Sequence, residues 1–294
     1  MSGLIICSPY RVVYVNIGYG LFSGGASGGS GTRTNVKYVY SNDTLLNGTL
    51  LNIGRYSTGI VGSTEKAYIC GGGGTAGGAY TATCETYQYN SDEVSMGANL
   101  TTPRASMYGI GNADLGIICA GWIGSTIYTV MDKYTYGTNA ISVGTAITQQ
   151  RYGNMGVGTS TFGLVVSGFT GAIYTQSIER YVYATDVVSA ATNLTAGQFA
   201  GCCSSTMTVG YLYGGYPGGP TTYKYTYATD VVTTGTDILT GGGYNIGATG
   251  NSTKGIITTG TGTKYDYATD TSTSPGFAIA IGGAAGISSI PAHF

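Results

Sequence analysis

The chain has 294 residues, of which only 9% are charged, and its 12 Lys and Arg residues nearly balance its 13 Asp and Glu residues. Non-specific binding to nucleic acid needs a basic surface, so this balance argues against nucleic acid as a partner. Gly is abundant at 52 residues, but 27 Tyr and an apolar content of 42% argue against disorder. Gly combined with Tyr, Thr and Val is typical of short strands joined by tight turns.

The beginning of the chain predicts an ordinary first strand. Its first residues, Met1 to Cys7, contain no basic segment, and their apolar run is too short for a signal peptide. Elsewhere no apolar run reaches the roughly 18 residues that cross a bilayer as a helix. We therefore expect synthesis without secretion and no membrane insertion.

Six cysteines in a chain of this length do not suggest a disulfide framework. Cys70 and Cys119 occupy one repeat position, where other copies carry Ser, Val, Tyr or Thr. We interpret a position that accepts such replacements as one filled by packing, with no metal or redox role.

A short motif recurs along the whole chain: Tyr-x-Tyr, with an acid or amide five positions after the first Tyr. A regular period of 40 to 49 residues is the signature of a propeller or a solenoid. The six copies are Tyr38/Asp43, Tyr87/Asp92, Tyr134/Asn139, Tyr181/Asp186, Tyr225/Asp230 and Tyr265/Asp270.

Two further markers run in phase with this motif. An apolar pair bounded by glycines, as in Gly116 to Gly121, predicts a buried strand. Upstream of it stands a third marker, which is Arg55, Arg104, Arg151, Gln198 or Gly243 in the later copies. Each repeat then reads as four short strands. In the third repeat these are expected at residues 105–110, 116–121, 133–136 and 141–147.

Four short strands per repeat, with twin glycines such as Gly24-Gly25 and Gly214-Gly215 ending the second, resemble the kelch family of β-propellers. The resemblance covers nearly the whole chain, although Tyr-x-Tyr stands where kelch repeats usually carry a Tyr and a Trp six positions apart. It implies an all-β fold: one domain over residues 1–294, built as a six-bladed β-propeller of kelch-like four-stranded blades. Either residues 284–294 complete the first blade or residues 1–9 extend the last one.

The amino-acid sequence of the repeat shows a second resemblance. The run Tyr-x-Tyr-Ala-Thr-Asp-Val-Val, as at Tyr225 to Val232, is similar to tandem repeats in virion proteins of bacteriophages, including cyanophages. This resemblance implies a place in a virion, for example in a tail fibre, a tail or a capsid surface.

Nearly all variation in repeat length falls between the second and third strands, and that loop shares a face with the third marker. Loops tolerate insertion and often carry function. Just after the closing Gly of three successive repeats stand Trp122, Phe169 and Tyr216, beside Arg104 and Arg151. Aromatic and Arg residues anchor recognition surfaces, so these five are the predicted binding residues. Alternatively, each aromatic ring covers its own blade and the Arg ties the loops down.

The acid or amide of each Tyr-x-Tyr motif is expected on the opposite face, where it turns the chain from strand three into strand four. One acid per repeat does not make the six- to eight-oxygen cage of a calcium site. We therefore predict turn residues and no metal.

The sequence does not favour an enzyme. Its one histidine is His293, which argues against catalytic triads and multi-histidine metal sites. The sequence contains acids that could form a catalytic pair for glycoside hydrolysis, such as Asp92 with Glu93 or Glu65 with Glu85. Acids on turns are more often solvated, so we expect no catalytic residues and no cofactor.

The sequence thus predicts a non-catalytic structural or adhesion module of a bacteriophage virion. Its expected partners are other virion proteins, copies of itself or a host surface glycan, since low surface charge favours assembly. One alternative is an intracellular kelch-type scaffold that binds a peptide on the same face. A polysaccharide hydrolase is the other.

Overall fold

The structure is a computed structural model. It describes residues 4–8, 11–15, 18–27, 30–63, 65–74, 79–239, 246–258 and 262–276, the first two ranges as backbone only. Every regular element in these ranges is a β-strand. Among them no helix long and apolar enough to cross a membrane is found.

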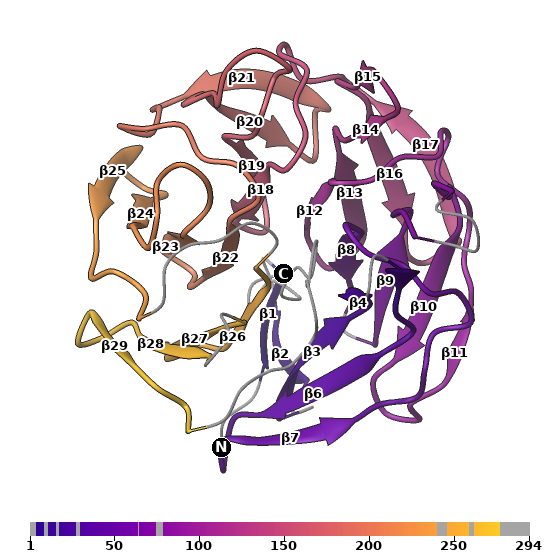
Figure 1. The fold of residues 1–294 in the computed structure, drawn as a ribbon, viewed down its shortest axis with the longest axis horizontal. Helices are drawn as coiled ribbons and strands as arrows, with labels where there is room; N and C mark the ends of the chain where they lie inside the picture. The colour runs from indigo at the N-terminus through magenta and orange to yellow at the C-terminus, as the bar shows by residue number, and fades with distance from the viewer. Residues whose placement is uncertain are drawn as a thin grey trace.

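Six antiparallel sheets are arranged radially around one axis, so the predicted six-bladed β-propeller is confirmed (Figure 1). Each of blades two to six has four strands that follow one another in sequence from the axis outward. Blade one contributes three strands within the described residues. These three are β3 (Tyr19–Ser23), β6 (Asn35–Val39) and β7 (Thr44–Asn47).

Blades two to four have the following strands. Blade two contains β8 (Gly59–Gly62), β9 (Lys66–Cys70), β10 (Cys84–Gln88) and β11 (Val94–Met96). Blade three contains β12 (Tyr108–Gly111), β13 (Leu115–Cys119), β16 (Met131–Thr135) and β17 (Ala140–Gly144). Blade four contains β18 (Met155–Gly158), β19 (Phe162–Val166), β20 (Ile178–Val182) and β21 (Val187–Ala191).

Blades five and six repeat the arrangement. Blade five contains β22 (Cys202–Ser205), β23 (Val209–Tyr213), β24 (Thr222–Thr226) and β25 (Val231–Thr234). Blade six contains β26 (Ala248–Gly250), β27 (Lys254–Ile257), β28 (Thr263–Asp266) and β29 (Thr271–Thr273). Three hairpins stand outside the blades: β1 (Leu4–Ser8) with β2 (Arg11–Val15), β4 (Ala26–Ser27) with β5 (Ser30–Gly31), and β14 (Trp122–Ile123) with β15 (Thr126–Ile127).

The ring closes between blade six and blade one, where β26 packs against β3. The Tyr40 hydroxyl and the Thr249 Oγ1 are 2.9 Å apart across this junction. The β1 strand pairs with β2, so within the described residues it does not extend blade six. The other expected seam, residues 284–294, lies outside the described residues.

Strand one begins later than the sequence predicts. In the third repeat β12 starts at Tyr108, whereas residues 105–110 were the expected strand. Ala105 instead forms an isolated bridge to Trp122, and Ser106 takes a left-handed φ of 51°. The chain therefore bends at Ser106 before it enters the inner strand.

The Tyr-x-Tyr rings fill the space between neighbouring blades. The first Tyr of every copy is at most 1% exposed. The second reaches the preceding blade: Tyr136 stacks on Tyr68 with ring centroids 4.7 Å apart, and Tyr267 stacks on Tyr211 at 4.4 Å. Large aromatic rings thus provide much of the apolar contact that holds the blades together.

The interpretation of Cys70 as a packing residue is wrong. Cys70 and Cys84 lie directly opposite each other on β9 and β10 and are joined by a disulfide. The repeat comparison failed because Cys84 stands on another strand, outside the position that was compared. Cys119 is free and buried, as packing requires.

The six acid or amide residues after Tyr-x-Tyr confirm the turn prediction. All have φ between 51° and 59°, a left-handed conformation that Asp and Asn tolerate better than most residues. In five copies the first Tyr hydroxyl also donates to this side chain: Tyr38 to Asp43, Tyr87 to Asp92, Tyr134 to Asn139, Tyr181 to Asp186 and Tyr265 to Asp270.

These same acids have a second role, which sequence reasoning missed. The residue just before the first Tyr of one blade reaches the acid of the next blade and forms an ion pair. The N–O distances run from 2.6 to 3.4 Å. The pairs are Lys37–Asp92, Lys133–Asp186, Arg180–Asp230, Lys224–Asp270 and Lys264–Asp43, of which the last closes the ring. Partial burial acts to raise the pKa of Asp186, but hydrogen bonds from Lys133 and Tyr181 outweigh it and the pKa falls to about 2.

The junction between blades two and three is the exception, because Thr86 stands at the cation position and Asn139 at the acid position. We expect Thr86→Lys combined with Asn139→Asp to add the missing pair. For a partly exposed pair the coupling free energy should be about 0.2–1 kcal/mol, and each single variant should gain nothing. Urea unfolding of the wild type, the two single variants and the double variant at pH 7 measures this coupling free energy.

The pH dependence tests its cause. An aspartate whose pKa is lowered in the folded state stabilises the fold above about pH 4 and loses this effect as the pH falls toward its folded-state pKa. The coupling should therefore shrink as the pH falls below about 4, and a coupling that kept its full size down to pH 2 would not be electrostatic.

Candidate functional site

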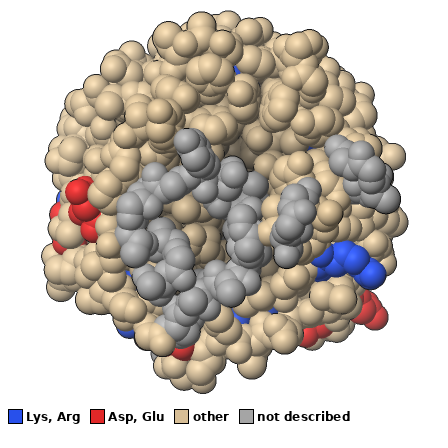
Figure 2. All heavy atoms as spheres, viewed as in Figure 1, with Lys and Arg blue, Asp and Glu red and all other residues tan. Residues whose placement is uncertain are grey.

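The two faces of the disc differ in charge. Because the strands alternate in direction, the loops between strands two and three share one face with the links between blades. We call this the loop face, and the other the turn face. On the loop face the exposed charged side chains among the described residues are Arg33 and Asp237. Figure 2 shows one face of the disc, on which uncharged residues predominate and the charged atoms are few. Such a face does not select strongly charged ligands.

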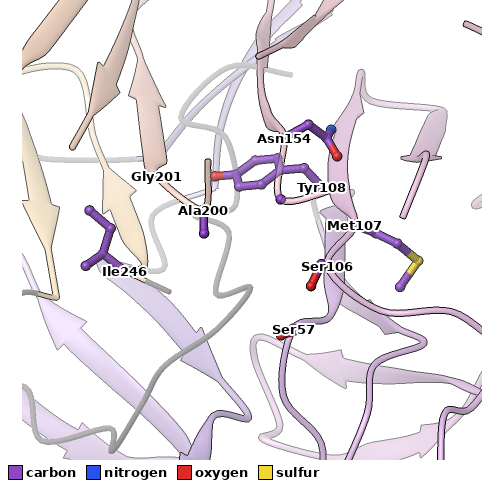
Figure 3. Close-up of a pocket in the computed structure, with 9 residues that line it drawn as sticks. Ser57, Ser106, Met107, Tyr108, Asn154, Ala200, Gly201 and Ile246 are labelled. Atoms are coloured by element: carbon purple, nitrogen blue, oxygen red, sulfur yellow. The ribbon is translucent and has the colours of Figure 1, made fainter. Parts of the chain in front are cut away.

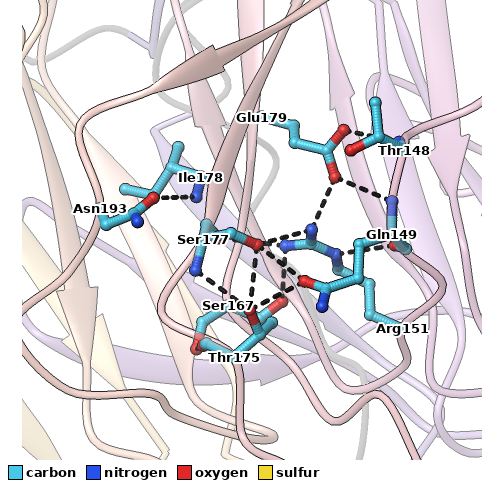
Figure 4. A network of polar contacts seen from close by, with 9 residues as sticks. All are labelled: Thr148, Gln149, Arg151, Ser167, Thr175, Ser177, Ile178, Glu179 and Asn193. Atoms are coloured by element: carbon cyan, nitrogen blue, oxygen red, sulfur yellow. Dashed lines mark hydrogen bonds and ion pairs between the residues drawn. The ribbon is translucent and has the colours of Figure 1, made fainter.

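Arg151 is buried beneath the loop face, contrary to the expected recognition role. Its Nη2 donates to Glu179 at 2.6 Å, and its Nη1 donates to the Ser177 carbonyl at 3.0 Å (Figure 4). Glu179 also accepts hydrogen bonds from the backbone amides of Thr148, at 2.6 Å, and Gln149, at 3.4 Å. Burial lowers the pKa of Arg151 and the Glu179 charge opposes this effect. The pair fastens the link between blades to strand three.

Arg104 repeats this arrangement in blade three. It is fully buried, donates to Asp132 at 2.7 Å and to the Ala120 carbonyl at 2.7 Å, while Asp132 accepts from the Thr101 hydroxyl at 2.7 Å. The prediction that Arg104 and Arg151 contact a ligand is therefore wrong for this structure. The alternative, that the Arg ties the loops down, describes both.

The acid partner could have been found in the sequence. Two positions before the first Tyr, an acid occurs in each of the three repeats that carry the Arg marker: Glu85, Asp132 and Glu179. In blade five, where Gln198 replaces the Arg, Tyr223 replaces the acid. Joint presence and joint loss within one chain is the pattern expected of a buried ion pair, since either charge alone would be costly.

The three predicted aromatic residues do lie on the loop face, each paired through its backbone with the residue after the Arg marker position. Two tyrosine rings link them. Tyr152 joins Trp122 to Phe169, with centroid distances of 5.3 and 5.7 Å, and Tyr174 joins Phe169 to Tyr216 at 5.0 and 5.2 Å. The result is a continuous row of rings over blades two to five. We name it the aromatic belt; its members are Tyr80, Trp122, Tyr152, Phe169, Tyr174, Phe199 and Tyr216.

Sequence reasoning missed four members of the belt. Tyr152 and Phe199 directly follow the Arg marker position, and Tyr56 stands at the same place in blade two. An alignment of the repeats would therefore have shown that this position is often aromatic. Tyr80 and Tyr174 lie in the loops of variable length, where repeats cannot be aligned. Position in the repeat predicts a residue on a regular strand far better than one in a loop.

The belt rings are half-buried, apart from Tyr216, which is 41% exposed. Within the described residues the hydroxyls of Tyr80, Tyr152 and Tyr174 make no hydrogen bond to protein. The first Tyr of strand three differs in five repeats, because its hydroxyl donates to the acid or amide of the following turn. Burial raises the pKa of both Tyr80 and Tyr152, so their hydroxyls stay protonated near neutral pH and can donate. The belt thus offers flat apolar rings and free polar groups together.

A small cavity lies at the centre of the ring, lined by residues of several blades, including Ser106, Tyr108, Asn154 and Ile246 (Figure 3). Its volume of about 20 Å³ accommodates about one water molecule. Both amide atoms of Asn154 are buried without a partner among the described residues, and such a water would satisfy them. This cavity is too small for an organic ligand.

Two of the four acids named as possible catalytic pairs lie in ion pairs, whereas Glu65 and Glu93 are exposed on the turn face. Asp92 is paired with Lys37, and Glu85 is fully buried against Arg55 at 2.7 Å. Glu85 is therefore closed to a substrate. In the described part of the chain no group of three or more His, Cys, Asp or Glu side chains could hold a metal ion.

Comparison with known proteins shows the fold and no more. No family model matches the chain, and no curated protein matches it. Among solved structures, 700 chains match. One is the structure of YjhT, which is similar with a TM-score of 0.60 and 13% identity, over 70% of this chain and 73% of the other. The TM-score supports a shared fold, and identity this low carries no residue roles. A propeller with an aromatic face that carries few charges is suited to an interaction or binding module.

Proposed function

We propose that this protein is a non-catalytic adhesion or structural module of a bacteriophage virion, and that it binds a host surface glycan or a neighbouring virion protein through the aromatic belt. The observation that carries the binding role is the continuity of the belt. Trp122, Phe169 and Tyr216 are linked by Tyr152 and Tyr174 into one partly exposed row on a face with few charges.

Energetics favour this use of the belt. Exposed aromatic rings cost free energy in water, and a folded chain that only needed to cover its blade ends could use smaller residues, as blade one does with Ala26. Trp and Tyr are also the residues that most often dominate binding energy. The rigid blades beneath the belt, tied by buried ion pairs, hold the rings in place before binding and so reduce the entropy lost on association.

The place in a virion rests on the similarity of the Tyr-x-Tyr-Ala-Thr-Asp-Val-Val repeat to tandem repeats of phage virion proteins. The low content of charged residues, 9%, is consistent with assembly into a particle, because ionic repulsion between copies is weak. The non-catalytic assignment rests on the acids, since Glu85, Asp132 and Glu179 are each held in a buried ion pair.

The combined variant Trp122→Ala and Phe169→Ala tests the proposal. Labelled protein should bind to host cells or to purified virion proteins, and the variant should weaken this binding by about tenfold or more, because two stacking rings are lost. Met207→Ala is the matched control, since it removes an exposed apolar side chain from the turn face. Undiminished binding by the double variant would contradict the role of the belt. Absence of the chain from purified particles would contradict the virion assignment.

A further inference from the structure

We infer that the aromatic belt holds an uncharged polysaccharide chain, with successive sugar units lying along successive rings. This inference rests on the proposed binding role of the belt and names its ligand class. The first argument is shape. The belt is a row that follows the ring of blades, and neighbouring rings such as Tyr80 and Trp122, or Trp122 and Tyr152, have centroids 5.6 and 5.3 Å apart. A row of separate flat surfaces fits a linear chain of repeating units.

The second argument is the chemistry of the rings. One side of a sugar ring presents C–H bonds that pack on an aromatic face, and its edge presents hydroxyls that need hydrogen-bond partners. The belt supplies both, because Tyr80, Tyr152 and Tyr174 each combine a ring with a hydroxyl that makes no hydrogen bond to a described residue. Gln150 and Gln176 are exposed two residues away from Tyr152 and Tyr174 in the sequence. Each amide donates to a backbone carbonyl at 3.2 Å, and its oxygen can accept from a sugar hydroxyl. A site that stacks rings and also satisfies hydroxyls matches a carbohydrate better than an apolar protein surface.

The third argument is charge. Near the belt the described Arg, Asp and Glu side chains are buried in pairs, as Arg104–Asp132 and Arg151–Glu179 are. The two exposed charges of the loop face, Arg33 and Asp237, lie on blade one and on the link from blade five to blade six. A polyanion such as an acidic polysaccharide would find no exposed cation among the described residues of blades two to four on this face. The ligand is therefore an uncharged chain.

The fourth argument separates a sugar chain from a protein partner. A stable protein interface buries about 800 Å² on each side around a well-packed apolar centre. The belt is one to two rings wide, since Phe199 packs beside Tyr152, Phe169 and Tyr174. Most of its rings are half-buried, so each offers a narrow surface. Narrow, repeated contacts of modest area are sufficient for a polymer, because many units bind along one chain.

The experiment is affinity electrophoresis through gels containing dextran, glucomannan, galactan or arabinoxylan, with hyaluronan and dextran sulfate as acidic counterparts. We expect at least one neutral polymer to retard the protein, and to do so equally at low salt and at about 0.5 M NaCl, where charge attraction is screened. Trp122 is the only tryptophan in the chain, so its fluorescence reports contact with the belt directly. Its emission should shift with the same polymer.

Two variants locate the contact. Tyr174→Ala should reduce retardation by about tenfold and Tyr174→Phe, which keeps the ring, by about threefold, whereas Met207→Ala should have no effect. Retardation by the acidic polymers alone, or by none, overturns the inference. If no polysaccharide binds but a virion protein does so through the belt, the carbohydrate inference fails while the proposed function stands. If Tyr174→Ala and the double variant at Trp122 and Phe169 change no binding of any kind, both fail.

Discussion

Replacing Glu179 by alanine is expected to lower the free energy of unfolding by about 3–5 kcal/mol, because it leaves the guanidinium group of Arg151 buried without its counter-ion. The loss exceeds that of an ordinary hydrogen bond. Glu179 accepts from Arg151 at 2.6 Å and also from the backbone amides of Thr148 and Gln149, so three donors lose their acceptor together. Urea unfolding measured by the intrinsic fluorescence of the chain gives the shift in midpoint.

The control variants separate the unpaired charge from the loss of a carboxylate. Glu65→Ala removes an exposed glutamate from the turn face and should change stability by less than about 0.5 kcal/mol. Arg151→Gln added to Glu179→Ala should recover part of the loss, since Gln198 occupies the equivalent position in blade five without a charge. A loss below about 1 kcal/mol for Glu179→Ala would contradict the role assigned to the pair.

The architecture of this protein could be predicted from its sequence because each blade uses the same few positions. Tyr-x-Tyr places the first Tyr on strand three in every repeat, and the number of evenly spaced copies predicts the number of blades. The disulfide between Cys70 and Cys84 could not be predicted this way, because it joins two strands of one blade and occurs once. The bend at Ser106 could not be predicted either. It depends on a left-handed φ, and serine at this position gives no sign of it, as a glycine would have done.

The site could be predicted only in part, for a physical reason. Recurrence of an Arg shows that a position matters, but a buried ion pair and an exposed anchor recur equally well. Only the partner distinguishes them, and the acid at Glu85, Asp132 and Glu179 was the missing signal. Trp122, Phe169 and Tyr216 were placed on the correct face because strand direction alternates strictly. Their connection through Tyr152 and Tyr174 depends on how neighbouring blades approach, which no single repeat encodes.

The packing between inner strands leads to a second large effect, at Gly109 in β12. A Cβ atom added there would lie 2.0 Å from the carbonyl oxygen of Ile60 and 2.5 Å from a methyl group of Val61, both on the inner strand of blade two. The nearest atom is backbone within a paired sheet, so it cannot move aside as a side-chain tip could.

Gly109→Ala should therefore force blades two and three apart and lower the free energy of unfolding by about 3 kcal/mol, the upper end of the cost of overpacking. Gly137→Ala is the matched control. Gly137 lies in the turn between β16 and β17, where an added Cβ meets nothing within 4 Å, so a change below about 0.5 kcal/mol is expected. Equal urea midpoints for the two variants would show that the blades can separate without cost. The blades would then not form the rigid support on which the aromatic belt depends. A selective loss at Gly109, with the fluorescence of Trp122 altered in the folded state, would show that inter-blade packing positions the belt.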